Sequence, residues 1–351
     1  MELINSTPVT CGLKLSVADG STTHRFGFLT AKATFSVDSQ SQVRLESQSP
    51  YPLFNKDEPC ASGVLPSDAV LRRDRVLEVL VLGSVHGHGK AQQVVELAVG
   101  SHRHSLLVTG NRRWSSHDRS ATISNAAPFD TVPMTWGRAY GGTAECWIDE
   151  HSVIDLEHPM NRYGVGFDAI KVADDVGKAF RAPAGYPRLA PGYKRALPNF
   201  EHPRHLIQRW DDEPRPYCWA PIPTDIGVHI QRAHDHMSHH KKAMSVEAMM
   251  EMVYHRAHPD WIIPVPEAQS MVSLKGMTSG RPWQFRLPSM RVLADFELGI
   301  QTGTHDLAPQ LLMLLPDESR FYLVYRHFFT METTSDMQRS FRVRLAEGWK
   351  Q

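Results

Sequence analysis

The chain has 351 residues, of which 41% are hydrophobic and 22% charged, and 38 Lys and Arg residues balance 38 Asp and Glu residues. This composition excludes a disordered chain, because it supplies enough apolar surface for a large core. Balanced charge also removes the long-range positive field that draws proteins to nucleic acid or anionic lipid, so we expect neither as a partner.

The termini and cysteines predict a cytoplasmic protein. The N-terminal segment MELINSTPVTCGLKLS lacks a basic region followed by an apolar stretch, and the chain has no apolar run long enough to span a bilayer. Cys11, Cys60, Cys146 and Cys218 are far apart and form no closely spaced pair for zinc or redox chemistry. We therefore expect reduced thiols in the core.

The first predicted strand covers residues 29–37, where apolar residues at odd positions alternate with polar residues at even positions. Three short apolar runs follow at Val76–Leu82, Val94–Val99 and Ser105–Thr109, separated by glycines. We expect these three runs to form a β-meander. From Ala121 to Pro223, Gly, Pro, Asn and aromatic residues predict long ordered loops over a sheet.

The last third of the chain combines one helix with further strands. Ser245–His255 lacks Gly and Pro, is rich in helix formers and begins with a capping Ser, so we predict a helix there. Period-2 alternation returns at Met290–Glu297 and, after a turn at Pro316–Ser319, at Arg320–Phe328.

The predicted fold class is mainly β, a β-rich α+β protein with antiparallel sheets, long Gly/Pro/aromatic loops and one or two short helices. We expect a single large domain over residues 1–351, which sublobes 1–120 and 121–330 could subdivide, with a C-terminal extension at 331–351.

Two glycine-rich segments resemble nucleotide-binding motifs only in part. Gly83–Lys90 has one residue too many before its Gly-Lys pair and lacks the following Ser or Thr that would hold magnesium, so we interpret it as a glycine-rich hairpin. Gly164–Ala169 matches the dinucleotide fingerprint by letter but follows no predicted strand, which favours a tight loop. We expect no cofactor.

Histidines concentrate in one segment, where seven of the 19 histidines of the chain occur. His236 and His240 would share one face if this segment were helical, a spacing that could place two imidazoles on a metal ion. However, the H-E-x-x-H motif is absent. A zinc-binding hydrolase or metal-stabilised protein is therefore the alternative interpretation, and we expect no catalytic residues. The seven residues are His229, His234, His236, His239, His240, His255 and His258.

A series of Gly, Trp, Arg and Pro-Asn motifs runs through the middle of the chain. After Lys32-Ala-Thr-Phe35, the motifs are Gly110-Asn-Arg-Arg-Trp114, Pro133-Met-Thr-Trp-Gly-Arg-Ala-Tyr-Gly-Gly142, Asn161-Arg-Tyr-Gly-Val-Gly166 and Leu197-Pro-Asn-Phe-Glu-His-Pro203. Pro282–Pro288 and Leu323–Arg326 extend the series toward the C-terminus.

This series resembles the bacterial type VI secretion accessory family, long catalogued as a domain of unknown function, over about residues 26–330. The resemblance implies an adaptor or chaperone that binds a toxin effector, or its PAAR-like tip domain, in the cytoplasm and helps to load it on the spike protein. The chain departs from the family pattern at three places. Asn111 stands where the family usually has Asp, and Arg162-Tyr163 replace a Pro. The family's A-P-x-D-Q segment is reduced to Ala257–Trp261.

We expect the motif residues to be mainly structural, because Gly permits positive φ and close approach while Trp and Tyr supply large apolar area. Arg138 can bridge carbonyl groups with its five donors. Aromatic residues in Pro-rich sequence are the candidate partner contacts: Trp210, Tyr217, Trp219 and Trp261. The motif positions are Lys32, Phe35, Gly110, Arg112, Trp114, Pro133, Trp136, Arg138, Gly141, Gly142, Asn161, Gly164, Gly166, Pro198, Asn199 and Glu201.

Overall fold

The computed structural model describes residues 1–16, 24–60, 63–68, 76–117, 120–147, 153–168, 194–209, 212–223, 255–298, 301–332 and 339–347. Among these residues the protein is mainly β, with mostly antiparallel sheets and three short 3-10 helices, η1 (Trp136–Arg138), η2 (Pro259–Trp261) and η3 (Pro316–Glu318). The predicted fold class is confirmed.

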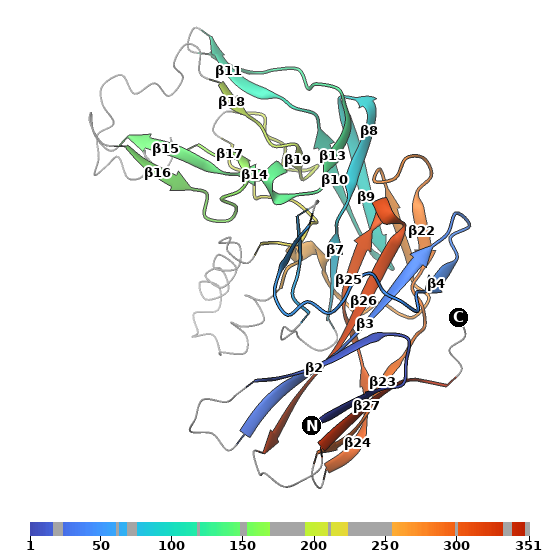
Figure 1. Cartoon of the computed structure of the whole chain (residues 1–351). Coiled ribbons are helices and arrows are strands. Elements are labelled where there is room, and N and C mark those ends of the chain that lie inside the picture. Colours follow the sequence, from blue (N-terminus) through green and yellow to red (C-terminus); the bar gives the residue numbers. More distant parts are fainter. Residues whose placement is uncertain are drawn as a thin grey trace.

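The largest sheet runs through the middle of the molecule (Figure 1). Its order is β2-β3-β26-β25-β7-β20, and β4 also pairs with β3. Within the described part of the chain its strands are β2 (Thr10–Ser16), β3 (His24–Val37), β4 (Val43–Leu45), β7 (Val76–Val81), β20 (Ile262–Pro264), β25 (Pro309–Leu315) and β26 (Arg320–Glu332).

A five-stranded sheet with the order β19-β10-β9-β21-β22 lies beside it. The strands are β9 (Gln92–Val99), β10 (His102–Thr109), β19 (Phe200–Glu201), β21 (Met271–Lys275) and β22 (Trp283–Arg286). A third sheet, with the order β1-β27-β23-β24, contains β1 (Glu2–Asn5), β23 (Val292–Leu298), β24 (Gln301–Leu307) and β27 (Arg339–Leu345). The predicted C-terminal extension thus supplies a strand in the interior of this sheet.

Most of the smaller ladders come from the middle of the chain and lie at the end of the molecule opposite β23, β24 and β27 (Figure 1). One sheet has the order β12-β11-β18, and the remaining strands pair as β13-β8, β14-β17, β15-β16 and β5-β6. Their bounds are β5 (Glu58–Cys60), β6 (Gly63–Leu65), β8 (Ser84–Lys90), β11 (Arg113–His117), β12 (Ser120–Ile123), β13 (Phe129–Pro133), β14 (Tyr140–Gly141), β15 (Thr143–Trp147), β16 (Val153–Glu157), β17 (Val165–Gly166) and β18 (Lys194–Ala196).

Strand β3 confirms the alternating pattern and also extends it. Its odd positions from Leu29 to Val37 are all buried, as the period-2 pattern predicts. Thr30, Lys32 and Thr34 on the opposite face are buried too, with 0% exposure at Lys32. This sheet therefore has no solvent face at its centre, and a charged residue there needs a partner.

The predicted meander is wrong in one respect. Strands β9 and β10 form a hairpin, but β7 belongs to the large sheet, where it runs parallel to β25. The segment Gly83–Lys90, between β7 and β9, was predicted to be a glycine-rich hairpin. It is mainly strand β8, which pairs with β13 and does not fold back on itself. A short apolar run does not encode its partner, because pairing of distant segments decides it.

One main hydrophobic core joins the large sheets, and a smaller cluster is made of Trp114, Tyr140, Leu197 and Ile207. Cys218 is buried, whereas Cys11 and Cys60 are half-buried, and all three are free thiols. The predicted helix Ser245–His255 lies outside the described residues except for His255.

Candidate functional site

The motif residues of the sequence series lie in the interior. Arg112, Pro133, Arg138 and Gly164 are half-buried, and the other motif positions are buried. The four motifs between Gly110 and Pro203 meet at the junction of η1, β14, β17 and β19, whereas Lys32 and Phe35 lie in β3. Their packing supports a structural role for most of these side chains.

Asn161 connects two motifs through its side chain. Its amide Nδ2 donates to the carbonyl oxygens of Trp136 at 2.9 Å and Tyr140 at 3.0 Å, and the residue has 0% exposure. Its own carbonyl accepts from the N–H of Gly142 at 2.8 Å. Without this side chain the Tyr140 carbonyl would lose this donor, and the Trp136 carbonyl would keep only the N–H of Ala139, at 3.2 Å.

Gly141 and Gly142 allow this close approach. Their φ values are 141° and 106°, a region that side chains rarely adopt. A Cβ atom on Gly141 would lie 2.1 Å from the carbonyl oxygen of Asn161. Both glycines are therefore required by geometry, as the sequence predicts.

Asn199 joins the next two motifs. Its Nδ2 donates to the carbonyl of Thr109 at 2.8 Å and to Oδ1 of Asn111 at 3.2 Å. Its Oδ1 accepts from Nη1 of Arg138 at 3.1 Å. Because only an acceptor oxygen is needed at position 111, Asn serves there in place of the Asp of the resembled family.

Arg112 and Glu201 form an ion pair at the edge of this region, with the Glu201 side chain only 1% exposed. The other carboxylate oxygen of Glu201 accepts from the N–H of Ile207 at 2.8 Å. Burial raises the pKa of Glu201, while the Ile207 amide and the Arg112 guanidinium oppose that rise. The ion pair thus ties β19 to the chain before β11.

Lys32 forms a second buried ion pair inside the large sheet. Its Nζ lies 2.5 Å from Oδ2 of Asp68 and donates to the carbonyl of Pro52 at 2.9 Å. The rings of Phe54 and Tyr322 lie 4.2 and 4.7 Å from the ammonium group. Burial lowers the pKa of Lys32, and the Asp68 carboxylate opposes that change. These contacts support a structural role for this motif lysine.

Three of the four predicted partner contacts are not available at the surface. Trp219 and Trp261 have 0% exposure and Tyr217 has 3%. Their rings pack edge to face, with centroids 5.7 Å apart for Trp219 and Trp261. The carbonyl of Trp219 accepts from Val81 of β7, which draws this Pro-rich segment into the core. The prediction of exposed anchors is wrong for these three, and Trp210 lies outside the described residues.

The histidine segment is described only at its end. His236 and His240 lie outside the described residues, as do His229, His234 and His239. Nδ1 of His255 lies 3.1 Å from Oε1 of buried Glu78. The described part of the chain contains no group of three or more His, Cys, Asp or Glu side chains that could hold a metal ion.

Sequence reasoning missed two histidines, His104 and His202, which share contacts with His258 of the predicted histidine cluster. Nδ1 of His104 and Nδ1 of His258 each lie 3.6 Å from Oδ2 of Asp260, and His202 packs against Tyr217. These residues come from three separated segments, so spacing along the chain carries no signal for them. The pKa of His202 is lowered by burial and then by His205, with Asp260 acting in the opposite direction.

The half-buried thiol of Cys11 and the buried thiol of Cys218 are poor nucleophiles. Burial raises the pKa of Cys11 and Cys218 to about 12, so both are protonated at neutral pH.

No helix among the described residues is long and apolar enough to cross a membrane.

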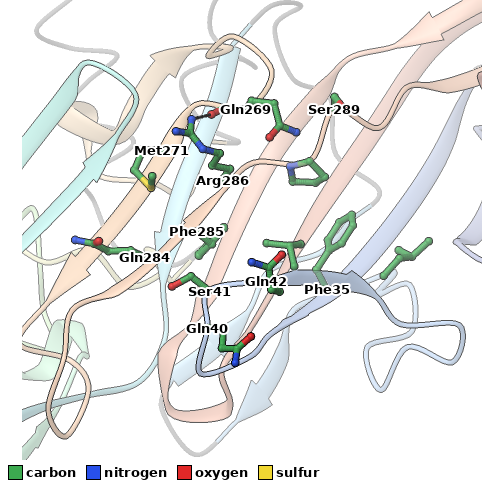
Figure 2. A pocket seen from close by; sticks show the side chains of 13 residues that line it. Phe35, Gln40, Ser41, Gln42, Gln269, Met271, Gln284, Phe285, Arg286 and Ser289 are labelled. Atoms are coloured by element: carbon green, nitrogen blue, oxygen red, sulfur yellow. Dashed lines mark hydrogen bonds between the residues drawn. The ribbon is translucent and has the colours of Figure 1, made fainter. Parts of the chain in front are cut away.

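A groove of about 610 Å³ lies between the β3–β4 hairpin and β22. Gln40, Ser41 and Gln42 line one side and Gln284 and Arg286 the other, as Figure 2 shows. Beneath it, Phe321 stacks with both Phe35 and Phe285, at centroid distances of 4.9 and 4.3 Å. This aromatic floor fixes β22 against the face of β3.

The fold and these contacts define a multi-sheet β protein whose motif residues build an interior scaffold and whose described surface carries a polar groove beside a sheet edge. The chain belongs to the family described as uncharacterized protein conserved in bacteria (DUF2169), whose model matches residues 23–326. No curated protein and no solved structure matches the chain. Strands β1, β2 and β27 lie outside the matched residues.

Proposed function

We propose that this protein is a type VI secretion adaptor that binds a toxin effector, or its PAAR-like tip domain, in the cytoplasm and promotes its loading onto the spike protein. The observation that carries the proposal is the ordered motif series from Lys32 to Glu201, which resembles that accessory family. Dense Gly, Trp and Asn motifs of this kind fix a scaffold, and a shared scaffold is what adaptors for related clients require.

The burial of the motif residues supports a client-binding surface outside the motifs. Since Trp136, Asn161 and Asn199 are buried, they preserve the fold and cannot contact a partner directly. A client would then contact sheet edges and loops around this scaffold, which is the usual place for specificity on a rigid framework. In this proposal, surface residues outside the motifs determine which client the protein binds.

Untagged co-expression tests the proposal. The chain is expressed with candidate toxins, PAAR-like tip proteins and spike proteins encoded beside it, and complexes are separated by size exclusion. We expect a stable complex with a toxin or tip protein. Recovery of the lone chain from every mixture would contradict the proposal. Stoichiometric zinc in that lone chain would favour the alternative, a metal-stabilised protein or zinc hydrolase using the His229–His258 segment.

A further inference from the structure

Strand β22 ends the five-stranded sheet, and β21 is its neighbour among the described strands. Antiparallel strands bond through every second residue of each strand. The N–H of Leu287 donates to the carbonyl oxygen of Ser270 at 2.9 Å, and Phe285 is opposite Val272. The backbone N–H and C=O groups of Leu287 and Phe285 therefore point toward β21. By alternation, the backbone groups of Gln284 and Arg286 face away from β21, on the open side of the strand.

The open side of β22 adjoins the groove. Phe285 points inward at 1% exposure, while Gln284 and Arg286 are exposed and line the groove (Figure 2). The opposite wall belongs to β4, where Val43 and Leu45 line the groove from the same face as Phe35. If a strand were added beside β22, the inward side chains of that strand would therefore cover Val43.

The lining chemistry suits a peptide backbone. Glutamine amides at positions 40, 42, 269 and 284 offer both donors and acceptors. Arg286 is the one charged side chain among the described residues that line the groove. Its Nη1 donates to the carbonyl of Gln269 at 3.1 Å, which orients the guanidinium and leaves further donors for a carboxylate.

We propose that an extended segment of the client protein binds in this groove as an added strand on β22, with an acidic side chain opposite Arg286. This inference rests on the proposed adaptor function and names its docking surface. Four residues of β22 span about 13 Å at 3.3 Å per residue, so the paired part of the segment is about four to six residues long. Backbone pairing gives affinity, and Arg286 gives the preference for acidic sequence.

The test uses the complex recovered by co-expression and compares two neighbouring positions of β4. Val43→Arg fills the groove, whereas Arg44→Val changes the opposite face of the same strand, where Arg44 is 76% exposed. We expect Val43→Arg to weaken binding about tenfold or more and Arg44→Val to change it less than about twofold. Arg286→Gln, which preserves the backbone, should weaken binding and reduce its salt dependence.

Hydrogen exchange supplies a backbone readout that does not depend on a variant folding. In the wild-type complex, the amides of Gln284 and Arg286 should exchange about tenfold more slowly than in the free protein. A stable complex with unchanged exchange at both amides, or with full affinity in Val43→Arg, would overturn strand addition while the adaptor function stands. Failure to recover any complex would contradict both proposals.

Discussion

Gly141 and Gly280 have nearly the same backbone angle, with φ values of 141° and 140°, but different surroundings. A Cβ at Gly141 would meet the Asn161 carbonyl oxygen at 2.1 Å, while a Cβ at Gly280 would meet nothing within 4 Å. The pair therefore separates backbone strain, which both substitutions share, from collision with the motif scaffold.

We predict that Gly280→Ala lowers the free energy of unfolding by about 1–3 kcal/mol through strain alone. Gly141→Ala should lower it by at least about 2 kcal/mol more, because the backbone of Asn161 must move. Chemical denaturation of both variants measures the difference. Equal losses would show that the close approach at Gly141 is not important for stability.

His158 makes the folded state sensitive to acid. Its Nδ1 accepts from the N–H groups of Met160 and Asn161, both at 3.2 Å, and its ring packs on Tyr140 and Phe167. Burial lowers its pKa from 6.5 to about 4. Between these pH values the unfolded chain binds a proton that the folded chain does not, so stability falls as pH falls from 6.5 to 4.

The pH prediction concerns His158→Asn, whose Oδ1 can accept the same two hydrogen bonds but does not titrate. The wild-type protein should lose up to about 3 kcal/mol more than this variant between pH 6.5 and 4. Urea denaturation at a series of pH values gives both curves. Parallel curves for the two proteins would mean that His158 titrates normally in the folded state.

At the residue scale, sequence reasoning predicted the motif glycines and Trp136 well. A pair of glycines has a direct physical meaning, since φ and space restrict the site to Gly. Sequence reasoning failed for Trp219 and Trp261, because Pro-rich composition predicts irregular backbone but does not predict burial. The burial of these two side chains depends on tertiary packing of their segments against β7.

At the scale of elements, β27 shows how a terminal strand can hold a sheet together. It runs parallel to β1 and antiparallel to β23, so it lies inside its sheet. Phe341 and Val343 have 0% exposure, and the Phe341 ring packs against Phe329 at a centroid distance of 4.7 Å. The last strand therefore contributes to the core although it lies outside the family match.

We predict that Phe341→Ala lowers the free energy of unfolding by about 3–5 kcal/mol, through lost burial and the cavity left behind. Arg342→Ala, at the exposed neighbouring position of the same strand, should change it by less than about 0.5 kcal/mol. Thermal and chemical denaturation test this. A small effect of Phe341→Ala would mean that β27 is weakly bound to the sheet.

Strand prediction succeeded where alternation was clear, as in β3 and β23, and was silent about partners. The pattern at 29–37 identifies the strand but not the second buried face, which depends on the distant Asp68 and on residues 52–54. Likewise, nothing in Val76–Val81 indicates its parallel partner β25, because that pairing forms across most of the chain.

For the whole molecule, the motif series alone indicates a bacterial family of unknown function, and the fold places most of those motif residues in the interior. The β22 groove carries no signal in the sequence, since Gln42, Gln284 and Arg286 are unremarkable one by one and meet only through the packing of two sheets. The candidate interaction surface is thus a property of tertiary structure.

The proposed role of this protein is to load a toxin onto the secretion spike. The most direct measurement isolates the spike protein from bacteria with and without this chain and quantifies the toxin that co-purifies with it. We predict that loss of the chain strongly reduces spike-bound toxin and that wild-type protein restores it, whereas Val43→Arg does not. An unchanged amount of toxin on the spike without the chain would contradict the proposed role.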